Sequence, residues 1–243
     1  MTDKELFAKI DHTLLSPTAT LQQIRMLCVE AMDYKCASVC IPPSYVKQVH
    51  AEFPELNICT VIGFPLGYNT TQAKITETAQ AIADGANEID MVVNITAVKN
   101  HDFDLVMDEI TKIKKVCGKH ILKVIVETCY LTQDEKIMLC RSVTSAGADF
   151  IKTSTGKIAV SATPEAAYVM CKAIKEYYEQ TGIKKGFKAA GGINTVKDAI
   201  GYYTIVKEVL GEEWLNNKYF RLGTSRLANL LLSEIVGKEV KFF

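Results

Sequence analysis

The sequence lacks an excess of charge of either sign and lacks long runs of one residue type. Its 28 basic and 28 acidic residues give a formal net charge of zero, and no lysine- or arginine-rich segment stands out. Nowhere do about 18 apolar residues follow one another, as a membrane-spanning helix needs, and no secretory signal pattern opens the chain. These absences argue against a nucleic-acid or membrane partner and predict a soluble protein.

The chain also lacks the closely spaced cysteines and histidines that are typical of metal sites. Its 8 cysteines contain no Cys-x-x-Cys pair, and its 4 histidines are dispersed. In a chain of this size we interpret the cysteines as reduced, mostly buried thiols of a cytoplasmic protein. We therefore expect no zinc or iron site.

No linker or low-complexity tract divides the 243 residues, so residues 1–243 are expected to form a single domain around one large core. Short apolar runs alternate with longer amphipathic ones, the pattern of a parallel sheet with helical crossovers. The predicted strands are Ile10–Thr13, Ser38–Ile41, Cys59–Gly63, Glu88–Asn94, Ile121–Glu127, Asp149–Thr153, Gly186–Ala190 and Tyr219–Gly223. Eight strands predict an α/β fold of the parallel (β/α)8 TIM-barrel type, here with a short N-terminal helix.

Two helix starts and two helix ends can be identified between these strands. Thr132-Gln133-Asp134-Glu135 is a capping box, and Thr163-Pro164-Glu165 places proline in the first turn of a helix. Gly85 and Gly147 stand where helices are expected to end.

A faint internal repeat relates an aspartate to a lysine. The segment from Ala83 to Asp90 resembles the segment from Ser145 to Lys152, so Asp90 and Lys152 each follow a helix-ending glycine by five residues. They fall on the fourth and sixth strands, and alternate strands contribute to one interior layer of such a barrel. We expect the two side chains to face each other, either as a structural ion pair or as part of a functional site.

Lys123 and Lys188 also lie within apolar strands, and three strand lysines exceed what one aspartate can neutralise. Lys152 ends its strand before the hydroxyl- and glycine-rich loop Thr153-Ser154-Thr155-Gly156-Lys157. Burial and positive neighbours both lower the pKa of a lysine from about 10.4. A neutral amine at a strand end is a nucleophile for carbonyl carbons.

Two further loops indicate a phosphate group on the substrate. Gly191-Gly192-Ile193-Asn194 follows the seventh strand, and Gly223-Thr224-Ser225-Arg226 follows the eighth, each expected to open directly into a helix. Amides at helix starts bind phosphate, and these loops are the recurrent phosphate site of TIM barrels. A glycine pair alone also serves as a tight turn.

Several of these segments together resemble the deoxyribose-phosphate aldolase family. The resemblance rests on Ile10–Leu15, Glu88–Asn94, Phe150–Gly156, Lys188–Ile193 and Arg221–Ser225, in order along nearly the whole chain. It implies a class I aldolase, a carbon-carbon lyase without metal or organic cofactor. Such an enzyme reversibly cleaves 2-deoxy-D-ribose 5-phosphate to D-glyceraldehyde 3-phosphate and acetaldehyde, in the catabolism of deoxyribonucleotide sugar.

The resemblance also implies roles for single residues. Lys152 would form the Schiff base, Lys188 would lower the pKa of its amine, and Asp90 would work with Lys123 in a proton relay. Cys40 matches a thiol near the active site, and Asp11 matches a residue of its polar network. The full set of expected substrate-binding residues is Asp11, Cys40, Thr155, Gly156, Lys157, Gly191, Gly192, Gly223, Thr224 and Ser225, with Gly192, Ser225 and Lys157 holding the phosphate.

Two positions depart from the family pattern. Arg226 stands where many relatives have a second serine, and the chain ends in Phe242-Phe243 where some members end in tyrosine. The alternatives are a Schiff-base aldolase for a ketone donor, such as a transaldolase or a bisphosphate aldolase, and a barrel isomerase or decarboxylase that forms no imine. A non-catalytic binding protein would explain the glycine loops but not three strand lysines. The sequence does not determine the oligomeric state, and a homodimer is one option.

Overall fold

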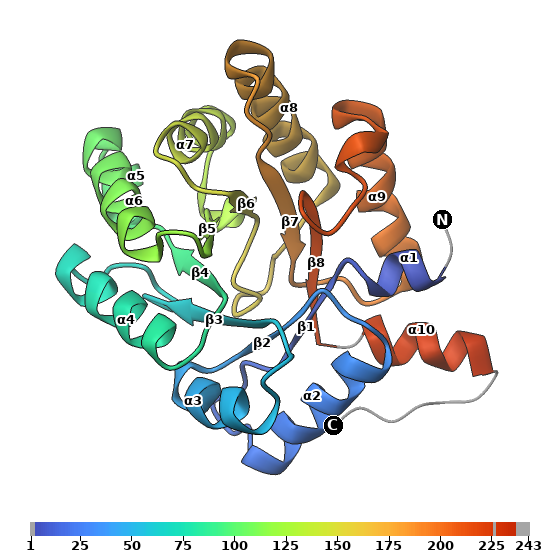
Figure 1. Ribbon diagram of the computed structural model, residues 1–243. Coiled ribbons are helices and arrows are strands. Elements are labelled where there is room, and N and C mark those ends of the chain that lie inside the picture. The colour runs from blue at the N-terminus through green and yellow to red at the C-terminus, as the bar shows by residue number, and fades with distance from the viewer. Residues whose placement is uncertain (1–2, 226, 237–243) are drawn as a thin grey trace.

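Eight parallel strands close into a barrel surrounded by helices in the computed structural model (Figure 1). It describes residues 3–225 and 227–236, so Arg226, Phe242 and Phe243 lie outside the described residues. The strands are β1 (Ile10–Thr13), β2 (Ser38–Ile41), β3 (Ile58–Ile62), β4 (Glu88–Val92), β5 (Ile121–Ile125), β6 (Phe150–Lys152), β7 (Gly186–Ala190) and β8 (Phe220–Thr224). The helices are α1 (Asp3–Phe7), α2 (Leu21–Asp33), α3 (Pro43–Glu52), α4 (Thr71–Ala83), α5 (Ile95–Lys99), α6 (Phe103–Cys117), α7 (Gln133–Ser145), α8 (Pro164–Thr181), α9 (Val196–Leu210) and α10 (Leu227–Val236), with 3-10 turns η1 (Thr128–Tyr130) and η2 (Glu212–Trp214).

The predicted eight-stranded barrel and its short N-terminal helix are confirmed; the bounds of β1, β2 and β7 agree with the prediction, and those of the other five strands differ by one or two residues. β4 stops at Val92 because the side chain of Asn94 accepts a hydrogen bond from the Ala97 amide and starts α5. β5 stops at Ile125 because Glu127 adopts a left-handed backbone conformation, with φ at 48°. Local capping and turn geometry therefore end these strands before the apolar pattern ends.

The expected helix signals are present. Thr132 and Glu135 form a reciprocal capping box at the start of α7, and Thr163 caps α8 with Pro164 in its first turn. Gly85 and Gly147 follow α4 and α7 with φ at 107° and 96°, conformations that residues with a Cβ rarely adopt. None of the helices in the described ranges has the length and apolar character needed to cross a membrane.

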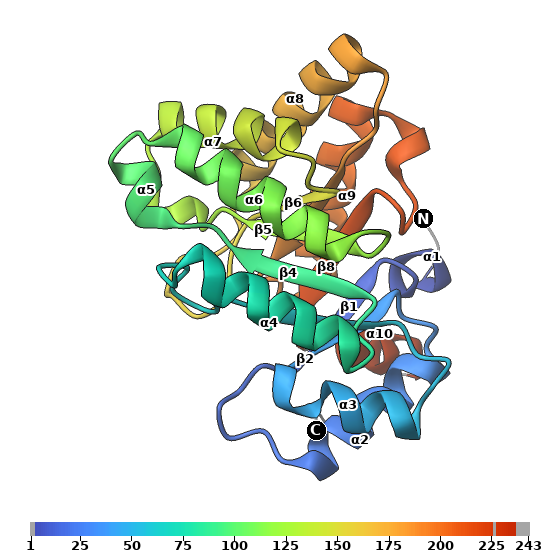
Figure 2. The same cartoon turned by 60° about the vertical axis from the view of Figure 1, so that its left-hand side comes forward.

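The strands separate two environments. Alternate residues such as Ile89 and Met91 of β4, and Leu122 and Val124 of β5, belong to the main hydrophobic cluster between barrel and helices. Figure 2 shows α4 and α6 side by side on the outside of this part of the barrel. The residues that alternate with these along β4 and β5, such as Asp90 and Lys123, point into the barrel, so their charges are held away from water.

Candidate active site

A cluster of charged strand residues occupies the barrel interior. Asp90 of β4 accepts hydrogen bonds from three lysines: Lys123 Nζ lies 2.9 Å from Oδ1, and Lys152 Nζ and Lys188 Nζ each lie 2.7 Å from Oδ2. Asp90, Lys123 and Lys188 are fully buried, and Lys152 is 3% exposed. The expected meeting of Asp90 and Lys152 is confirmed, and both other lysines also point inward.

The tilt of the barrel strands explains why Asp90 and Lys152 meet. Asp90 pairs in register with Lys123, and Lys123 pairs with Phe150, which is two residues before Lys152. In a barrel with a shear of about eight, the residue at the same height shifts by about one position per strand. Two strands away from Asp90, the residue in the same layer is therefore Lys152.

Beneath Lys123 and Lys188 lies a second layer of charge. Arg221 of β8 contacts Asp11 through Nη1 at 2.5 Å and Glu88 through Nη2 at 2.9 Å. Asp11 reaches Lys188 at 2.6 Å, and Glu88 reaches Lys123 at 2.5 Å. Glu88 and Arg221 were not expected from the sequence, although each is a charged residue at an inward position of an apolar strand, the signal that identified the lysines.

The cluster holds more positive than negative charge. Three lysines and one arginine face three carboxylates, which leaves one surplus positive charge when all seven groups are ionised. Lys123 and Lys188 each lie within 4 Å of two or more carboxylates. For Lys152 the structure gives a single ion pair, to Asp90.

The carboxylates also set the pKa values of the cluster. Burial by itself raises the pKa of Asp90, but Lys123, Lys152 and Lys188 together hold it well below its ordinary value. Burial lowers the pKa of Lys188, but Asp11 and Asp90 outweigh this and raise it. The pKa of Lys123 is raised in the same way. The sequence count of one aspartate against three lysines was incomplete, because Asp11 and Glu88 supply two more carboxylates.

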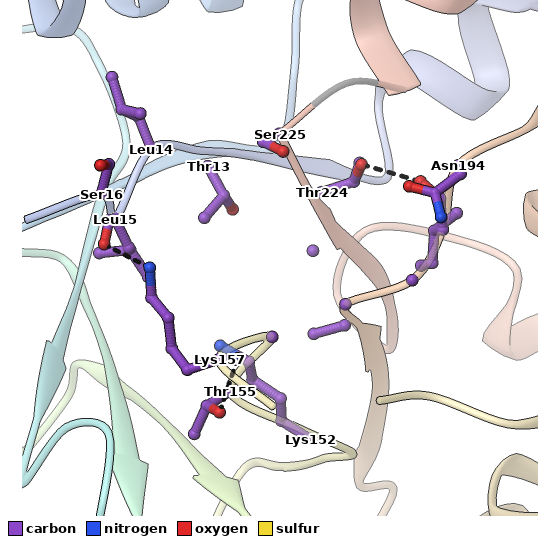
Figure 3. Close-up of a pocket in the computed structure, with 16 residues that line it drawn as sticks. Thr13, Leu14, Leu15, Ser16, Lys152, Thr155, Lys157, Asn194, Thr224 and Ser225 are labelled. Carbon is purple, nitrogen blue, oxygen red and sulfur yellow. Dashed lines mark hydrogen bonds between the residues drawn. The ribbon is translucent and has the colours of Figure 1, made fainter. Parts of the chain in front are cut away.

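Above this cluster a cavity of about 310 Å³ opens at the carboxyl ends of the strands. The cavity is lined by Thr13, Leu14, Leu15, Ser16, Lys152, Thr155, Gly156, Lys157, Ala190, Gly191, Gly192, Ile193, Asn194, Gly223, Thr224 and Ser225. Figure 3 shows Lys152, Thr155 and Lys157 on one side of the open centre, with Thr13, Thr224 and Ser225 across from them. The cavity therefore brings together Lys152 and all three loops that the sequence indicated.

The remaining predicted residues lie deeper. Asp90, Lys123 and Lys188 lie beside Lys152 without lining the cavity, and Asp11 and Cys40 are fully buried. In this structure any part of Asp11 and Cys40 in substrate binding is indirect. The segment Thr13–Ser16, by contrast, lines the cavity. Its first three residues were expected only as part of a family motif, and Ser16 was not expected at all.

Two glycines, Gly191 directly after β7 and Gly223 within β8, provide space. Gly191 has φ at 76°, and a Cβ there would come within 2.9 Å of the Gly156 Cα in the loop after β6. A Cβ on Gly223 would lie 2.9 Å from Cε of Lys188. These two positions therefore let two loops meet at the cavity and let a lysine side chain fit inside the barrel.

The two loops differ in how they enter their helices. Thr224 Oγ1 accepts a hydrogen bond from the Leu227 amide, so the β8 loop opens directly into α10, as expected. The β7 loop also leads directly into its helix, because Thr195 is the N-cap of α9. Here, however, the Asp198 carboxylate accepts hydrogen bonds from the Asn194 and Thr195 amides, so these two amides are already engaged.

Lys157 borders two cavities. Its Nζ donates to the Leu15 carbonyl oxygen at 2.7 Å, across the opening seen in Figure 3. A second cavity of about 510 Å³ shares Leu15, Ser16 and Lys157 with the first and continues over Val61 and Phe64. In this structure the amine is engaged with the backbone rather than pointing into the open centre.

One group of possible metal ligands occurs among the described residues. The ligand atoms of Cys40, Cys59 and Asp90 lie within 4.8 Å of one another. Lys123 Nζ lies 2.9 Å from Asp90 Oδ1 and 3.4 Å from Cys59 Sγ, so an ammonium group already occupies the cationic position of this cluster. The residues present do not fit a metal centre.

Comparisons with known proteins identify relatives of this chain. Residues 6–207 match the family model described as DeoC/LacD family aldolase. A deoxyribose-phosphate aldolase of Clostridium botulinum strain Eklund 17B is 48% identical over 235 residues, covering 96% of this chain and 98% of the relative. One of Streptococcus pyogenes serotype M4 is 50% identical over 233 residues, covering 95% and 96%.

Solved structures agree with these sequence matches. The aldolase QR15 superposes with a TM-score of 0.82 at 31% identity, covering 95% of this chain and 97% of that one. The deoxyribose phosphate aldolase of Aeropyrum pernix, described as a unique tetrameric structure, gives 0.81 at 29% identity, covering 96% and 92%. From the fold, the buried lysine cluster and these matches, we conclude that the chain belongs to the DeoC/LacD family of aldolases.

Proposed function

We propose that this aldolase reversibly cleaves 2-deoxy-D-ribose 5-phosphate to D-glyceraldehyde 3-phosphate and acetaldehyde through a Schiff base on Lys152. The observation that carries the proposal is the position of Lys152, whose amine comes from a charged, buried cluster and lines the floor of a cavity bordered by glycine and hydroxyl loops. The names of the curated relatives support the substrate.

The first step requires a neutral amine at Lys152. Asp90 is shared by Lys123, Lys152 and Lys188, so its charge is divided among three cations, and the Lys152 proton leaves to solvent through the cavity that the amine lines. The amine then adds to the C1 aldehyde of the open-chain sugar and loses water to form an iminium ion, the electron sink of class I aldolases.

The second step breaks the bond between C2 and C3. A base takes the proton of the C3 hydroxyl, the electron pair of that bond moves into the iminium, and glyceraldehyde 3-phosphate leaves. The enamine left on Lys152 is protonated at C2 and hydrolysed to acetaldehyde. Asp90 and Lys123, joined at 2.9 Å, are the proposed proton relay, acting directly or through a water.

The phosphate is assigned to Gly192, Ser225 and Lys157, which line the cavity with Ser225 and Lys157 on opposite sides of its open centre (Figure 3). Ser225 and Gly192 are exposed in the cavity. Lys157 would have to exchange its bond to the Leu15 carbonyl for one to the phosphate, a change within reach of a flexible, exposed lysine.

Reductive trapping tests the proposal. Acetaldehyde with sodium borohydride should inactivate the enzyme and leave an ethyl group on Lys152, whereas dihydroxyacetone phosphate with borohydride should leave Lys152 unmodified. Trapping by the ketone would instead favour a transaldolase or bisphosphate aldolase, and a barrel isomerase would be trapped by neither. Modification spread evenly over surface lysines, with activity retained, would contradict the Schiff-base assignment.

Assembly and location are part of the same proposal. A homodimer is supported by exposed apolar side chains along α2, where Met26, Val29 and Met32 are 46–49% exposed. Sedimentation velocity would separate it from a monomer and from a tetramer. A cytoplasmic location is supported by the eight cysteines, which are all free.

A further inference from the structure

Glu127 is a buried glutamate at the mouth of the barrel that the proposed reaction does not use. It follows β5 with φ at 48° and ψ at 67°, a left-handed conformation unfavourable for a residue with a Cβ. Only 2% of its surface is exposed. An unfavourable backbone and a buried carboxyl group persist where neighbouring contacts fix them, and these contacts lead to the substrate cavity.

Within the described residues, the Glu127 carboxylate accepts its hydrogen bonds from Thr155 in the loop after β6. Thr155 Oγ1 donates to Glu127 Oε2 at 2.5 Å, and the Thr155 amide lies 3.2 Å from Oε2 and 3.3 Å from Oε1. The loops are also joined by their backbones, because the Thr128 amide donates to the Thr153 carbonyl at 3.1 Å. Glu127 thus holds the segment that follows Lys152.

The contact continues to the cavity surface. The Lys157 amide donates to Thr155 Oγ1 at 3.1 Å (Figure 3). Thr155, Gly156 and Lys157 all line the cavity. A threonine hydroxyl has one hydrogen to donate and two lone pairs to accept with. Here the hydrogen goes to Glu127 and one lone pair to Lys157, so the remaining lone pair can only accept.

We propose that Glu127 is a positioning residue that fixes Thr155 as a hydrogen-bond acceptor for a hydroxyl group of the substrate and holds the Thr155–Lys157 segment at the cavity. The proposal rests on the proposed function, since the hydroxyls in question are those of the sugar phosphate. The acetaldehyde half carries no hydroxyl, so it does not depend on this contact.

Electrostatics agrees with the geometry. Burial raises the pKa of Glu127, while the hydrogen bonds from Thr155 and the charge of Lys152 act in the opposite direction. A buried carboxylate without these donors would be strongly unfavourable, so Glu127 and Thr155 depend on each other.

The test separates sugar recognition from imine formation. Glu127→Gln and Thr155→Val should each lower kcat/KM for 2-deoxyribose 5-phosphate about tenfold to a hundredfold. Glutamine replaces one accepting oxygen by an amide that donates toward the Thr155 donors, and valine lacks the hydroxyl group. Borohydride trapping of acetaldehyde on Lys152 should stay within about twofold of wild type. The kcat/KM of the double variant should be no lower than that of the less active single variant, because both substitutions remove the same contact. Thr155→Ser, which keeps the hydroxyl, should restore most of the activity.

Glu135 provides the matched control, since its carboxylate also accepts a threonine amide, that of Thr132 at 2.8 Å, but far from the cavity. Glu135→Gln should change stability without changing kcat/KM. The proposal is overturned if Glu127→Gln keeps wild-type kcat/KM, if the two losses are additive, or if trapping falls in parallel with kcat/KM. Absence of trapping on Lys152 in the wild-type enzyme would instead refute the proposed function.

Discussion

Replacing Lys188 by leucine tests whether the surplus charge of the barrel interior prepares Lys152 for attack. Lys188 Nζ and Lys152 Nζ each lie 2.7 Å from the same oxygen, Asp90 Oδ2, so the two nitrogens are at most about 5.4 Å apart. Removing Lys188 brings the cluster to three cations and three carboxylates. The proton of Lys152 is then held more firmly.

The size of the effect follows from the distance. Two unit charges about 5 Å apart interact by roughly 3 kcal/mol at an effective dielectric constant of 20, which corresponds to about two pH units. The greater burial left by leucine acts in the opposite direction, so we expect the pH of half-maximal trapping to rise by about one to two units. Activity near neutrality should fall about tenfold or more.

The fold should survive this change. Asp90 keeps Lys123 and Lys152, and Asp11 keeps Arg221 as a partner, so no carboxylate is left unpaired. We expect a loss of about 1–3 kcal/mol in the free energy of unfolding, which lowers Tm by roughly 2–12 °C.

The assay is the rate of acetaldehyde trapping on Lys152 between pH 5 and 10, with circular dichroism to confirm folding. Lys185→Leu removes a buried lysine just before β7 and outside the cluster, so its trapping profile should match wild type. An unchanged or lower midpoint in Lys188→Leu, with the fold intact, would refute the charge argument.

Three further outcomes are expected. Ser225→Asp should lower kcat/KM for the phosphorylated sugar about a hundredfold, roughly 2.7 kcal/mol, and spare free 2-deoxyribose, because a carboxylate repels the phosphate; equal losses for both sugars would place the phosphate elsewhere. Prolonged EDTA treatment should leave turnover unchanged, whereas recovery only upon adding Zn²⁺ would indicate a metal-dependent aldolase. Because the pKa values of Asp11, Glu88 and Asp90 are lowered in the folded state, the stability they contribute is present above their unfolded values and is lost as pH falls below about 4. Thermal melts from pH 7 to pH 3 measure that loss, and Asp90→Asn should show a shallower decline.

Local patterns in the sequence were enough to predict the architecture. Eight apolar runs separated by amphipathic segments define a parallel barrel, because strands buried on both sides must be apolar and the connections must be helical. The capping box at Thr132 and the glycines after α4 and α7 involve residues within a few positions of each other. The meeting of Asp90 and Lys152 followed from their equal places on alternate strands.

Other properties required the tertiary structure. Asp11, Glu88 and Arg221 come from strands far apart in the sequence, and only closure of the barrel brings them together. Glu88 then helps to raise the pKa of Lys123, and Asp11 helps to raise that of Lys188. The depth of Asp11 and Cys40 below the cavity depends on strand tilt, which no local pattern reveals. The contact of Glu127 with Thr155 depends on a left-handed turn after β5. Sequence determines which strands carry charge, whereas strand tilt and loop conformation decide which charges meet.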